Sequence, residues 1–600
     1  MIDKGKYDLT TVIGVSLSVI AFILILVFRP GMPKNVQNQE PRQSGSVTET
    51  QATAQPETSA PQPAAEGEGA KEPSATAPES GGRREVAQPF PKSNGKPLRL
   101  GEGDFELDVS SDGAGIVAVN LNKYLLNAPK QAESNGPVVL SDGDYPFLAL
   151  SVPGGLIADG DGARRSADEV ELVRKSADGR LRVTEKWAIV PDRMYEIAYT
   201  ATIENLTGDS VPLQGITLEG SAMPTSVTPD RKASRGESSG GVSISQNGKV
   251  KDYSLKALAK LKAEERDGMS SSAASWAAVH SKYFVMAFWM NEGDFAGMEV
   301  AAVPSAGRDG AEPKPESRYH ARAILPNAVA EPGRPFTYSV TAYAGPKMFE
   351  RLYGYRRGLE SVMEMDRFFF WRPFWMRQIS RWLLKMLVWI SEMFPPSIGY
   401  GMAVIILTVL VKGIFWPLSH KSTASMRRMQ ALKPELDALR AKYKDDPSTM
   451  YRKQQELFKK NNVSQLGGCL PMLLQIPVFF ALFNTFRNAI EMRHASFLWA
   501  YDLSVPDTLS FSPEAVPIRP LALIMGLTMY FQQKMTPNPD PQQAKMMNFM
   551  SIFFIVLFYN MPSALTLYLS VSYILGIAQT ALTNKLMPPI AAAQEKKAAK

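Results

Sequence analysis

The sequence predicts a polytopic α-helical membrane protein with six transmembrane helices and one large all-β domain outside the cytoplasm. Three observations support this fold class. Apolar stretches of membrane-helix character lie near the N-terminus and in the last third of the 600 residues. Residues 98–345 instead alternate apolar and polar side chains with the two-residue period of half-buried strands. The segments rich in Lys and Arg all fall on one side of the membrane if the chain crosses it six times.

The composition argues against catalysis. Lys plus Arg number 66 and Asp plus Glu number 59, which gives a net charge of +7. Cys469 is the one cysteine, so an intramolecular disulfide and a cysteine-based zinc site are excluded. The four histidines lie far apart in sequence, and neither a Walker-type loop nor a nucleophile elbow is present. We therefore expect no enzyme, no catalytic residue, no metal site and no cofactor.

The N-terminal segment, residues 1–29, is predicted to be a transmembrane signal anchor. Leu9–Phe28 is a run of twenty uncharged residues, which is enough to cross about 30 Å of hydrocarbon. Lys4 and Lys6 precede it, and no small-residue cleavage site follows it. Residues 30–97 are rich in Pro, Ser, Ala and Glu and nearly free of large apolar residues, which predicts a disordered extracytoplasmic linker.

Residues 98–345 are predicted to form an antiparallel β-sandwich. In the clearest strand, one face carries Tyr195, Ile197, Tyr199, Ala201 and Ile203, and mostly polar residues lie between them. Similar runs occupy Leu181–Val190, Ser281–Met290 and Phe336–Tyr343. A ligand- or sugar-binding role and a scaffold role are both open for this domain. The scaffold is favoured because no cluster of site-like residues stands out.

Residues 346–398 are predicted to contain connecting and interfacial amphipathic helices. In Arg372–Phe394, apolar residues including Trp375, Trp382, Leu383 and Ile390 recur at helical spacing, with arginines and a lysine on other faces. Aromatic and cationic residues together suit a helix that lies in the membrane interface. A helix packed on the sandwich is the alternative.

Five further apolar stretches are predicted to cross the membrane: Met402–Leu418, Gly467–Phe486, Pro520–Gln533, Met546–Asn560 and Ala564–Asn584. The loop His420–Leu466 carries eleven Lys plus Arg, whereas Ile490–Arg519 carries two. By the positive-inside rule the first loop is cytoplasmic. Both termini, including the basic tail 588–600, are then cytoplasmic, and the sandwich lies outside.

Lys412 is the one charged residue inside the six predicted spans. A cation in hydrocarbon costs a few kcal/mol, so it marks a functional position by default. It could line a water-filled cavity that opens to the cytoplasm and attract polar parts of a translocating chain. Alternatively, its side chain could reach the headgroups, because Lys412 lies only about 9 Å from the cytoplasmic end of its span.

Polar residues in the other spans give a second set of candidates. They could line a polar groove or form hydrogen bonds between helices, and the second explanation is commoner for any single residue. The candidates for the groove, beside Lys412, are Thr408, Gln475, Gln533 and Ser572.

The cytoplasmic segment 420–465 is predicted to be a basic helical hairpin. Apolar residues keep helical spacing from Met426 to Tyr443, Asp446-Pro447 breaks the helix, and Thr449–Lys460 forms the second arm. A basic hairpin can contact RNA or anionic lipid, and methionine adapts to varied apolar partners. A hairpin seam with solvated charges is the alternative. The residues proposed for contacts are Met426, Arg427, Met429, Arg440 and Lys459.

These segments together resemble the YidC family of membrane protein insertases, in the Gram-negative form with a large periplasmic domain. The resemblance is carried by four ordered blocks and by two further blocks in the β domain. The four are Leu407–Leu418, Thr423–Leu436, Gln465–Phe483 and Phe558–Leu569; the two are Trp276–Phe288 and Tyr343–Lys347.

The resemblance implies the architecture. It implies a β-supersandwich in the periplasm and a five-helix insertase core over 399–587 in the bacterial inner membrane. The core is implied to hold a hydrophilic groove open to the cytoplasm and the lipid.

The resemblance also implies what the groove residues do. Thr408 matches a substrate-contacting threonine, and Tyr568 and Leu569 match a substrate-contacting tyrosine pair whose second aromatic is absent here. Lys412 matches a position where the family usually has arginine, and lysine keeps the charge without the planar fork.

The implied activity is insertion and folding of newly made membrane proteins, without enzymatic chemistry. The implied partners are nascent membrane proteins, the Sec translocon, the ribosome and membrane lipids. We expect no specific nucleic acid sequence among them, and a functional monomer. A secondary transporter or channel with an extracytoplasmic sensor domain is the alternative function, which inverted repeats would favour. An anchored carbohydrate-processing enzyme would need acids and histidines that converge in the sandwich.

Overall fold

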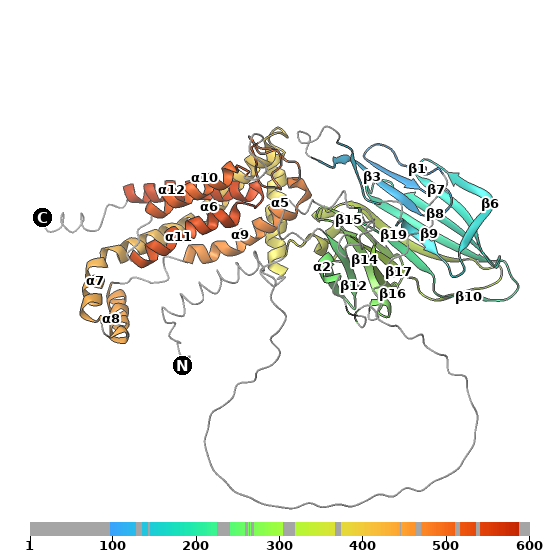
Figure 1. Ribbon diagram of the computed structural model, residues 1–600, viewed down its shortest axis with the longest axis horizontal. Helices are drawn as coiled ribbons and strands as arrows, with labels where there is room; N and C mark the ends of the chain where they lie inside the picture. The colour runs from blue at the N-terminus through green and yellow to red at the C-terminus, as the bar shows by residue number, and fades with distance from the viewer. Residues whose placement is uncertain are drawn as a thin grey trace, which may run out of the picture. The chain divides into compact units, whose positions relative to one another are not determined.

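The computed structural model describes residues 96–586, apart from 114, 128–134, 142–144, 225–239, 259–261, 263–264, 266–268, 304–317, 367–373, 445, 462–469, 510–516 and 536–540. The predicted signal anchor 1–29, nearly all of the predicted linker 30–97 and the predicted tail 588–600 lie outside the described residues. In the described part, strands occupy the chain as far as Pro346, interrupted by the short helix α2 (Leu255–Leu258), and helices follow (Figure 1).

The β domain contains two large antiparallel sheets within the described residues. The first has the order β1 (Leu98–Leu100), β2 (Phe105–Val109), β3 (Ile116–Leu125), β5 (Phe147–Ser151), β11 (Thr217–Ala222), β17 (Arg318–Ile324) and β16 (Gly297–Val303), with β4 (Pro137–Val139) paired to β3. The second has the order β13 (Lys249–Ser254), β12 (Gly241–Gln246), β14 (Ala274–His280), β15 (Phe284–Met290), β19 (Phe336–Pro346), β9 (Glu196–Asn205), β8 (Leu181–Ile189), β7 (Glu169–Ser176) and β6 (Leu156–Arg165). A small third sheet pairs β10 (Val211–Leu213) with β18 (Ala328–Ala330).

The predicted antiparallel all-β domain is confirmed, and its core follows from the alternation in the sequence. Tyr195 and the alternate residues of β9 as far as Ile203 are all at most 2% exposed. On the other face of the same strand, the Thr202 and Thr337 hydroxyls lie 3.0 Å apart. The two large sheets meet through aromatic side chains, since Phe147 of β5 packs edge-to-face on Phe288 of β15 at 5.9 Å.

The core also contains a buried ion pair. Arg174 of β7 and Glu185 of β8 are 5% and 0% exposed, and Arg174 Nη2 donates to Glu185 Oε2. The Tyr199 hydroxyl donates to the other carboxylate oxygen at 2.8 Å. Because every charge here has a hydrogen-bonding partner, the sandwich can hold the pair away from water.

The sandwich connects to the helices through α4 (Phe349–Gly354), the 3₁₀ helix η3 (Leu359–Met363) and α5 (Phe374–Ser391). The apolar residues of α5 divide between two faces. Aliphatic side chains such as Leu383, Leu387 and Ile390 are buried, and α5 packs against the later helices α6 (Gly399–Ala431) and α9 (Leu470–Asn488). Tryptophans at seven-residue spacing, Trp375, Trp382 and Trp389, are 44%, 67% and 60% exposed. The expectation that Trp375 and Trp382 share one apolar face with Leu383 is wrong, because the tryptophans and the buried aliphatic residues follow different stripes of the helix.

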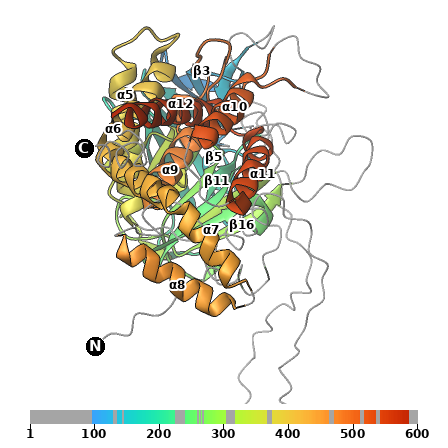
Figure 2. The ribbon, with the colours of Figure 1, turned by 90° about the vertical axis from the view of Figure 1, so that its left-hand side faces the viewer.

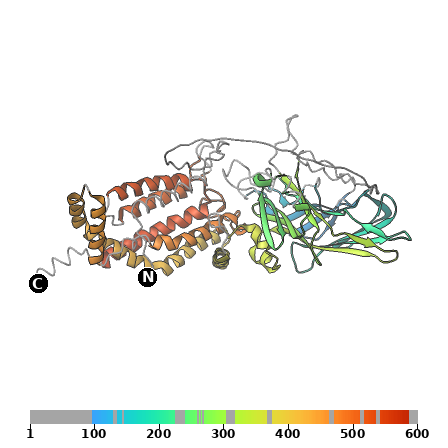
Figure 3. The same ribbon diagram turned by 90° about the horizontal axis from the view of Figure 1, so that it is seen from below.

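The predicted helical stretches after residue 399 are all present as helices. They are α6, α9, α10 (Pro520–Met535), α11 (Pro541–Phe558) and α12 (Ser563–Leu586), which run side by side in Figure 3. In the described residues, two of them, α6 and Ser563–Thr583 of α12, are long and apolar enough to cross a membrane. The helices are therefore confirmed, while six membrane crossings stay a prediction.

The hairpin differs from the prediction at its start. The apolar pattern predicts a span that ends at Leu418, but α6 continues without a break to Ala431. No glycine or proline lies between Leu418 and Leu432, so nothing in the sequence ends the helix there. The chain turns at Leu432, next to Pro434 in the first turn of α7 (Lys433–Lys442). The second arm is confirmed as α8 (Pro447–Lys460), which Asp446 caps by accepting from the Thr449 backbone N–H at 3.0 Å, and it lies beside α7 (Figure 2).

Glycines set the spacing between the core helices, which gives a stability prediction. A Cβ added at Gly526 of α10 lies 2.2 Å from Cγ1 of Ile555 of α11, whereas Gly413 of α6 has nothing within 4 Å. We expect Gly526→Val to lower the free energy of unfolding by about 1–3 kcal/mol, because the two helices must separate. Gly413→Ala, the control, is expected to be neutral or to stabilise by up to ~1 kcal/mol. Thermal unfolding of the full-length protein in detergent measures both, and equal midpoints for the two variants would contradict this packing.

Candidate functional site: polar side chains of the helical core

Lys412 and Thr408 lie one turn apart on α6. Lys412 is half-buried and has no hydrogen bond or ion pair with the described residues, while Leu410 and Ile414 beside it are 42% and 75% exposed. Thr408 is fully buried, and its hydroxyl donates to the Val404 carbonyl of the same helix at 2.6 Å. The structure thus places on α6 a cation that has no counter-ion in the described part of the chain, beside a face that is apolar and exposed.

Gln475 and Tyr568, two of the predicted groove residues, meet between α9 and α12. Gln475 Nε2 donates to the Tyr568 hydroxyl at 2.7 Å. Tyr568 is 2% exposed, and its ring centroid lies 6.4 Å from that of Phe486. Leu569 and Ser572, on the same helix as Tyr568, are 9% and 7% exposed. The sequence analysis had left open whether such residues line a groove or join helices, and this pair joins two helices.

Gln533 lies on a different contact. Its Oε1 accepts a hydrogen bond from the Ser551 hydroxyl at 2.7 Å, which joins α10 to α11. Ser551 was not among the predicted residues. The sequence does mark Ser551, because it is a small polar residue within the apolar stretch Met546–Asn560. Several other hydroxyls are satisfied within their own helix, as when Ser570 donates to the Thr566 carbonyl at 2.7 Å.

The predicted hairpin residues fall into three environments. Met429 packs against the hairpin core formed by Leu432, Leu436 and Phe458. Arg427 Nη1 donates to the Thr583 carbonyl near the end of α12 at 3.2 Å, which ties the extension of α6 to another core helix. Of the remaining predicted residues, Lys459 is exposed and Met426 is half-buried. Arg440 Nη1 lies 3.8 Å from Asp437 Oδ1 of the same helix.

The loop between α9 and α10 forms hydrogen bonds with the N-terminal ends of α10 and α12, which lie away from the hairpin. The start of α12 donates from the backbone N–H of Ser563 to the Val505 carbonyl at 2.8 Å, and Asp507 accepts from the Leu521 N–H at 2.8 Å. Arg519 Nη1 donates to the Tyr559 carbonyl at 2.7 Å. Burial raises the pKa of Glu491 in this loop to about 7. These bonds fix the helix ends on the side away from the hairpin.

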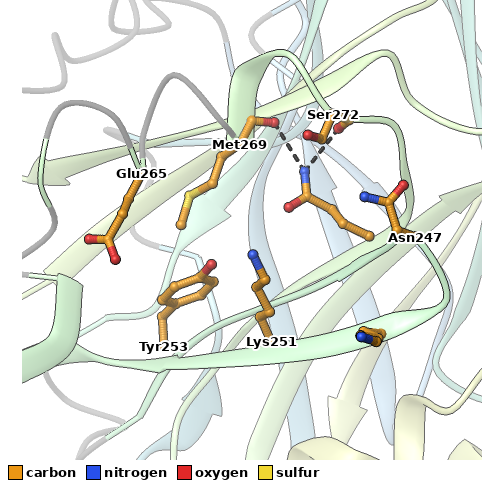
Figure 4. Close-up of a pocket in the computed structure, with 8 residues that line it drawn as sticks. Asn247, Lys251, Tyr253, Glu265, Met269 and Ser272 are labelled. Carbon is orange, nitrogen blue, oxygen red and sulfur yellow. Dashed lines mark hydrogen bonds between the residues drawn. The ribbon is translucent and has the colours of Figure 1, made fainter.

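A pocket of about 470 Å³ lies at one edge of the sandwich (Figure 4). Lys251 and Tyr253 of β13 face it, and the Gln246 amide donates to the Met269 and Ser272 carbonyls in its wall. Glu265 is the one carboxylate among the described lining residues, and they include no histidine. Across the described residues, no group of three or more His, Cys, Asp or Glu could hold a metal ion. Among the described lining residues, the pocket thus shows one acid and no cluster of acids and histidines.

Two family models match the chain in its two parts. The model described as the YidC periplasmic domain matches residues 99–376, and the model described as 60Kd inner membrane protein matches residues 389–591. A Geobacter sp. (strain M21) protein named membrane protein insertase YidC is 32% identical over 492 residues, which cover 79% of this chain and 83% of the relative. This chain belongs to the YidC family.

Other relatives match over a shorter length. The protein of the same name from Pelobacter propionicus is 38% identical over 317 residues, 52% of this chain and 54% of the relative. The chain thus spans about half the length of several curated relatives that it matches. The match to a solved structure described as an active YidC insertase covers 83% of this chain and 94% of that one, at 17% identity and a TM-score of 0.33.

Proposed function

We propose that this chain inserts newly made proteins into the bacterial inner membrane and assists their folding, alone or beside the Sec translocon. The observation that carries the proposal is the half-buried Lys412, which has no counter-ion among the described residues, on the long apolar helix α6 of a chain in this family. Family membership favours this activity over a transporter or channel. The partners are nascent membrane proteins, the ribosome that makes them and the surrounding lipids.

In the proposed topology the chain crosses the membrane six times, with the sandwich in the periplasm and both termini in the cytoplasm. The core helices carry a hydrophilic groove open to the cytoplasm and the lipid, lined by Lys412, Thr408 and polar residues of α9, α10 and α12. The hydrogen-bonded loop between α9 and α10 supports a closed outer end.

In the proposed mechanism, the protein lowers the free-energy barrier that a polar segment of the substrate meets when it crosses the membrane. A polar tail crossing hydrocarbon loses its hydrogen bonds to water, at a cost of several kcal/mol per unsatisfied group. A hydrated groove with a cation reduces that cost and attracts acidic residues. α10 has 16 residues and is therefore about 24 Å long, shorter than a typical hydrocarbon core, so it favours a locally thin bilayer. The apolar substrate helix then partitions into lipid at about 25 cal/mol per Å² of apolar surface. This scheme uses no cofactor and no nucleotide.

Disulfide crosslinking tests the groove. Cys469 is replaced by serine, and single Thr408→Cys or Tyr568→Cys variants are exposed to ribosome-stalled nascent chains that carry one cysteine in the transmembrane segment. Ile414→Cys, at a position 75% exposed on the lipid side of α6, is the matched control. We expect crosslinks at positions 408 and 568 while the nascent chain is short. Crosslinks at position 414 alone would show that the substrate does not use the groove.

A further inference from the structure

Two sequence blocks in the β domain, Trp276–Phe288 and Tyr343–Lys347, meet at a buried polar cluster. His280 of β14 and Lys347, next to the end of β19, are 5% and 3% exposed. Lys347 Nζ lies 3.1 Å from His280 Nδ1. We call this group, which consists of Ser243, Asp252, His280, Lys347 and Glu364, the junction cluster.

The partners of His280 define its protonation state. An ammonium can only donate, so Nδ1 of His280 accepts from Lys347 and carries no proton. The imidazole is therefore neutral, with its proton on Nε2. That nitrogen faces the Asp252 carboxylate at 3.2 Å and the Ser243 hydroxyl at 3.0 Å, and Ser243 donates to the same carboxylate oxygen at 2.8 Å. Neutral His280 thus contacts the Lys347 ammonium through Nδ1 and the Asp252 carboxylate through Nε2.

The ammonium of Lys347 also holds the segment after the sandwich. Lys347 Nζ donates to the Val362 carbonyl of η3 at 2.7 Å, and all five residues of η3 are buried. η3 is flanked by Gly358 and Glu364, which both have left-handed backbones with φ of 79° and 52°. A non-glycine residue keeps such a conformation only where its surroundings enforce it. The carboxylates of Asp252 and Glu364 both stabilise the charge of Lys347.

From η3 the contacts continue to α5. Arg377 of α5 donates to Glu360 at 2.8 Å and to Asp366 at 2.7 Å, and these carboxylates are 6% and 2% exposed. The Ser380 hydroxyl donates to the Met365 carbonyl at 2.9 Å. α5 in turn packs against α6, the helix that carries Lys412, and against α9.

We propose that His280 and Lys347 are positioning residues that hold α5 against the groove helices, and that protonation of His280 releases this hold. A proton on Nδ1 removes the acceptor for Lys347 and places a second cation 3.1 Å from its ammonium. The charged groups around the imidazole in the described residues are Lys347, Asp252 of β13 and Glu364 after η3. This inference rests on the proposed insertion activity.

The direction of the pH effect follows from the pKa shifts. Burial, followed by the Lys347 ammonium, lowers the pKa of His280 below its ordinary value near 6.5. The unfolded chain then binds this proton at a higher pH than the folded chain, so stability falls as the pH drops below about 6.5. Burial lowers the pKa of Lys347 from 10.5 to about 8, so stability rises as the pH increases between those two values.

The test uses the full-length protein in sealed proteoliposomes with the sandwich in the lumen and a constant outer pH. We expect insertion of a reporter protein to fall by about tenfold when the luminal pH is lowered from about 7.5 to about 4.5, with the loss confined to pH values below about 6.5, because a neutral bridge becomes a pair of cations. His280→Gln keeps an acceptor and a donor but cannot titrate there, so it should insert at both pH values and should control for the pH gradient. Lys347→Met should reduce insertion at both pH values, whereas Lys249→Met, an exposed lysine of β13, should not.

The results of this test distinguish a failure of the junction-cluster inference from a failure of the proposed function. If wild type and His280→Gln lose activity equally on acidification, the junction cluster is not the pH-sensitive element and the inference fails. If Lys347→Met lowers insertion only as far as its folded fraction falls in thermal unfolding, these residues have a structural role alone, which also overturns it. If Lys347→Met does not fold, the comparison of wild type with His280→Gln still decides. No insertion by wild type at luminal pH about 7.5 would instead contradict the proposed function.

Discussion

Lys412→Glu is expected to reduce the insertion of proteins with charged translocated tails by roughly 10- to 100-fold, since reversing the charge in the groove replaces an attraction for acidic segments by a repulsion, a change of about 1–3 kcal/mol. Lys412 has no counter-ion in the described residues, so a glutamate there repels acidic segments and gains no partner from the protein. Lys412→Arg keeps the charge and should retain most of the activity, whereas Lys412→Met should give an intermediate loss.

Protease protection of a reporter protein in proteoliposomes measures this effect. Lys421→Glu is the matched control, because Lys421 lies on the same helix and is exposed. Thermal unfolding of each variant in detergent separates loss of activity from loss of structure. Equal activity of Lys412→Glu and wild type, or equal losses at positions 412 and 421, would show that the charge at 412 has no specific role.

Glu185→Ala should lower the free energy of unfolding of the sandwich by about 3–5 kcal/mol, because it leaves the buried Arg174 cation without its partner. The same change removes the acceptor of the Tyr199 hydroxyl, and both side chains lie where water cannot replace Glu185. Replacing both partners, Arg174→Met with Glu185→Leu, should recover most of the lost stability, since an apolar pair of similar volume needs no desolvation of charges.

Arg182→Ala is the control for this prediction. Arg182 lies on the same strand, β8, but on the half-exposed side, where it pairs with Asp159 at 3.2 Å and with Glu204 at 3.6 Å. Exposed pairs of this kind contribute about 0–1 kcal/mol. Chemical denaturation of the full-length protein, followed by tryptophan fluorescence, reports the difference. Similar losses for Glu185→Ala and Arg182→Ala would show that the buried ion pair stabilises the sandwich no more than an exposed pair does.

Local patterns predicted much of the fold. The alternation in β9 predicted which face is buried, and the apolar stretches after residue 399 predicted helices, because both depend on residues close in sequence. The extent of α6 was harder to predict. The basic sequence after Leu418 predicts a cytoplasmic segment, which stays a prediction, and composition does not distinguish a new helix from the continuation of an old one.

Contacts between distant parts of the sequence were not predictable. The hydrogen bond from Gln475 to Tyr568 joins residues 93 positions apart, and His280 and Lys347 are separated by 67. Glu185 occupies a buried position of β8 and pairs with Arg174 of β7, and no sequence pattern identified this pair. Such pairs depend on sheet order and helix packing, which a single sequence does not specify. The assignment of Lys412 and Thr408 to a substrate groove stays a prediction.

The length of α6 has a mechanical consequence. Its 33 residues make a rod of about 50 Å, well beyond the thickness of a hydrocarbon core. Pro417 removes one backbone hydrogen bond within this rod, close to where it leaves the proposed membrane region. Because a long helix bends most readily at a proline, the hairpin end of α6 can change direction while the segment that holds Lys412 keeps its place.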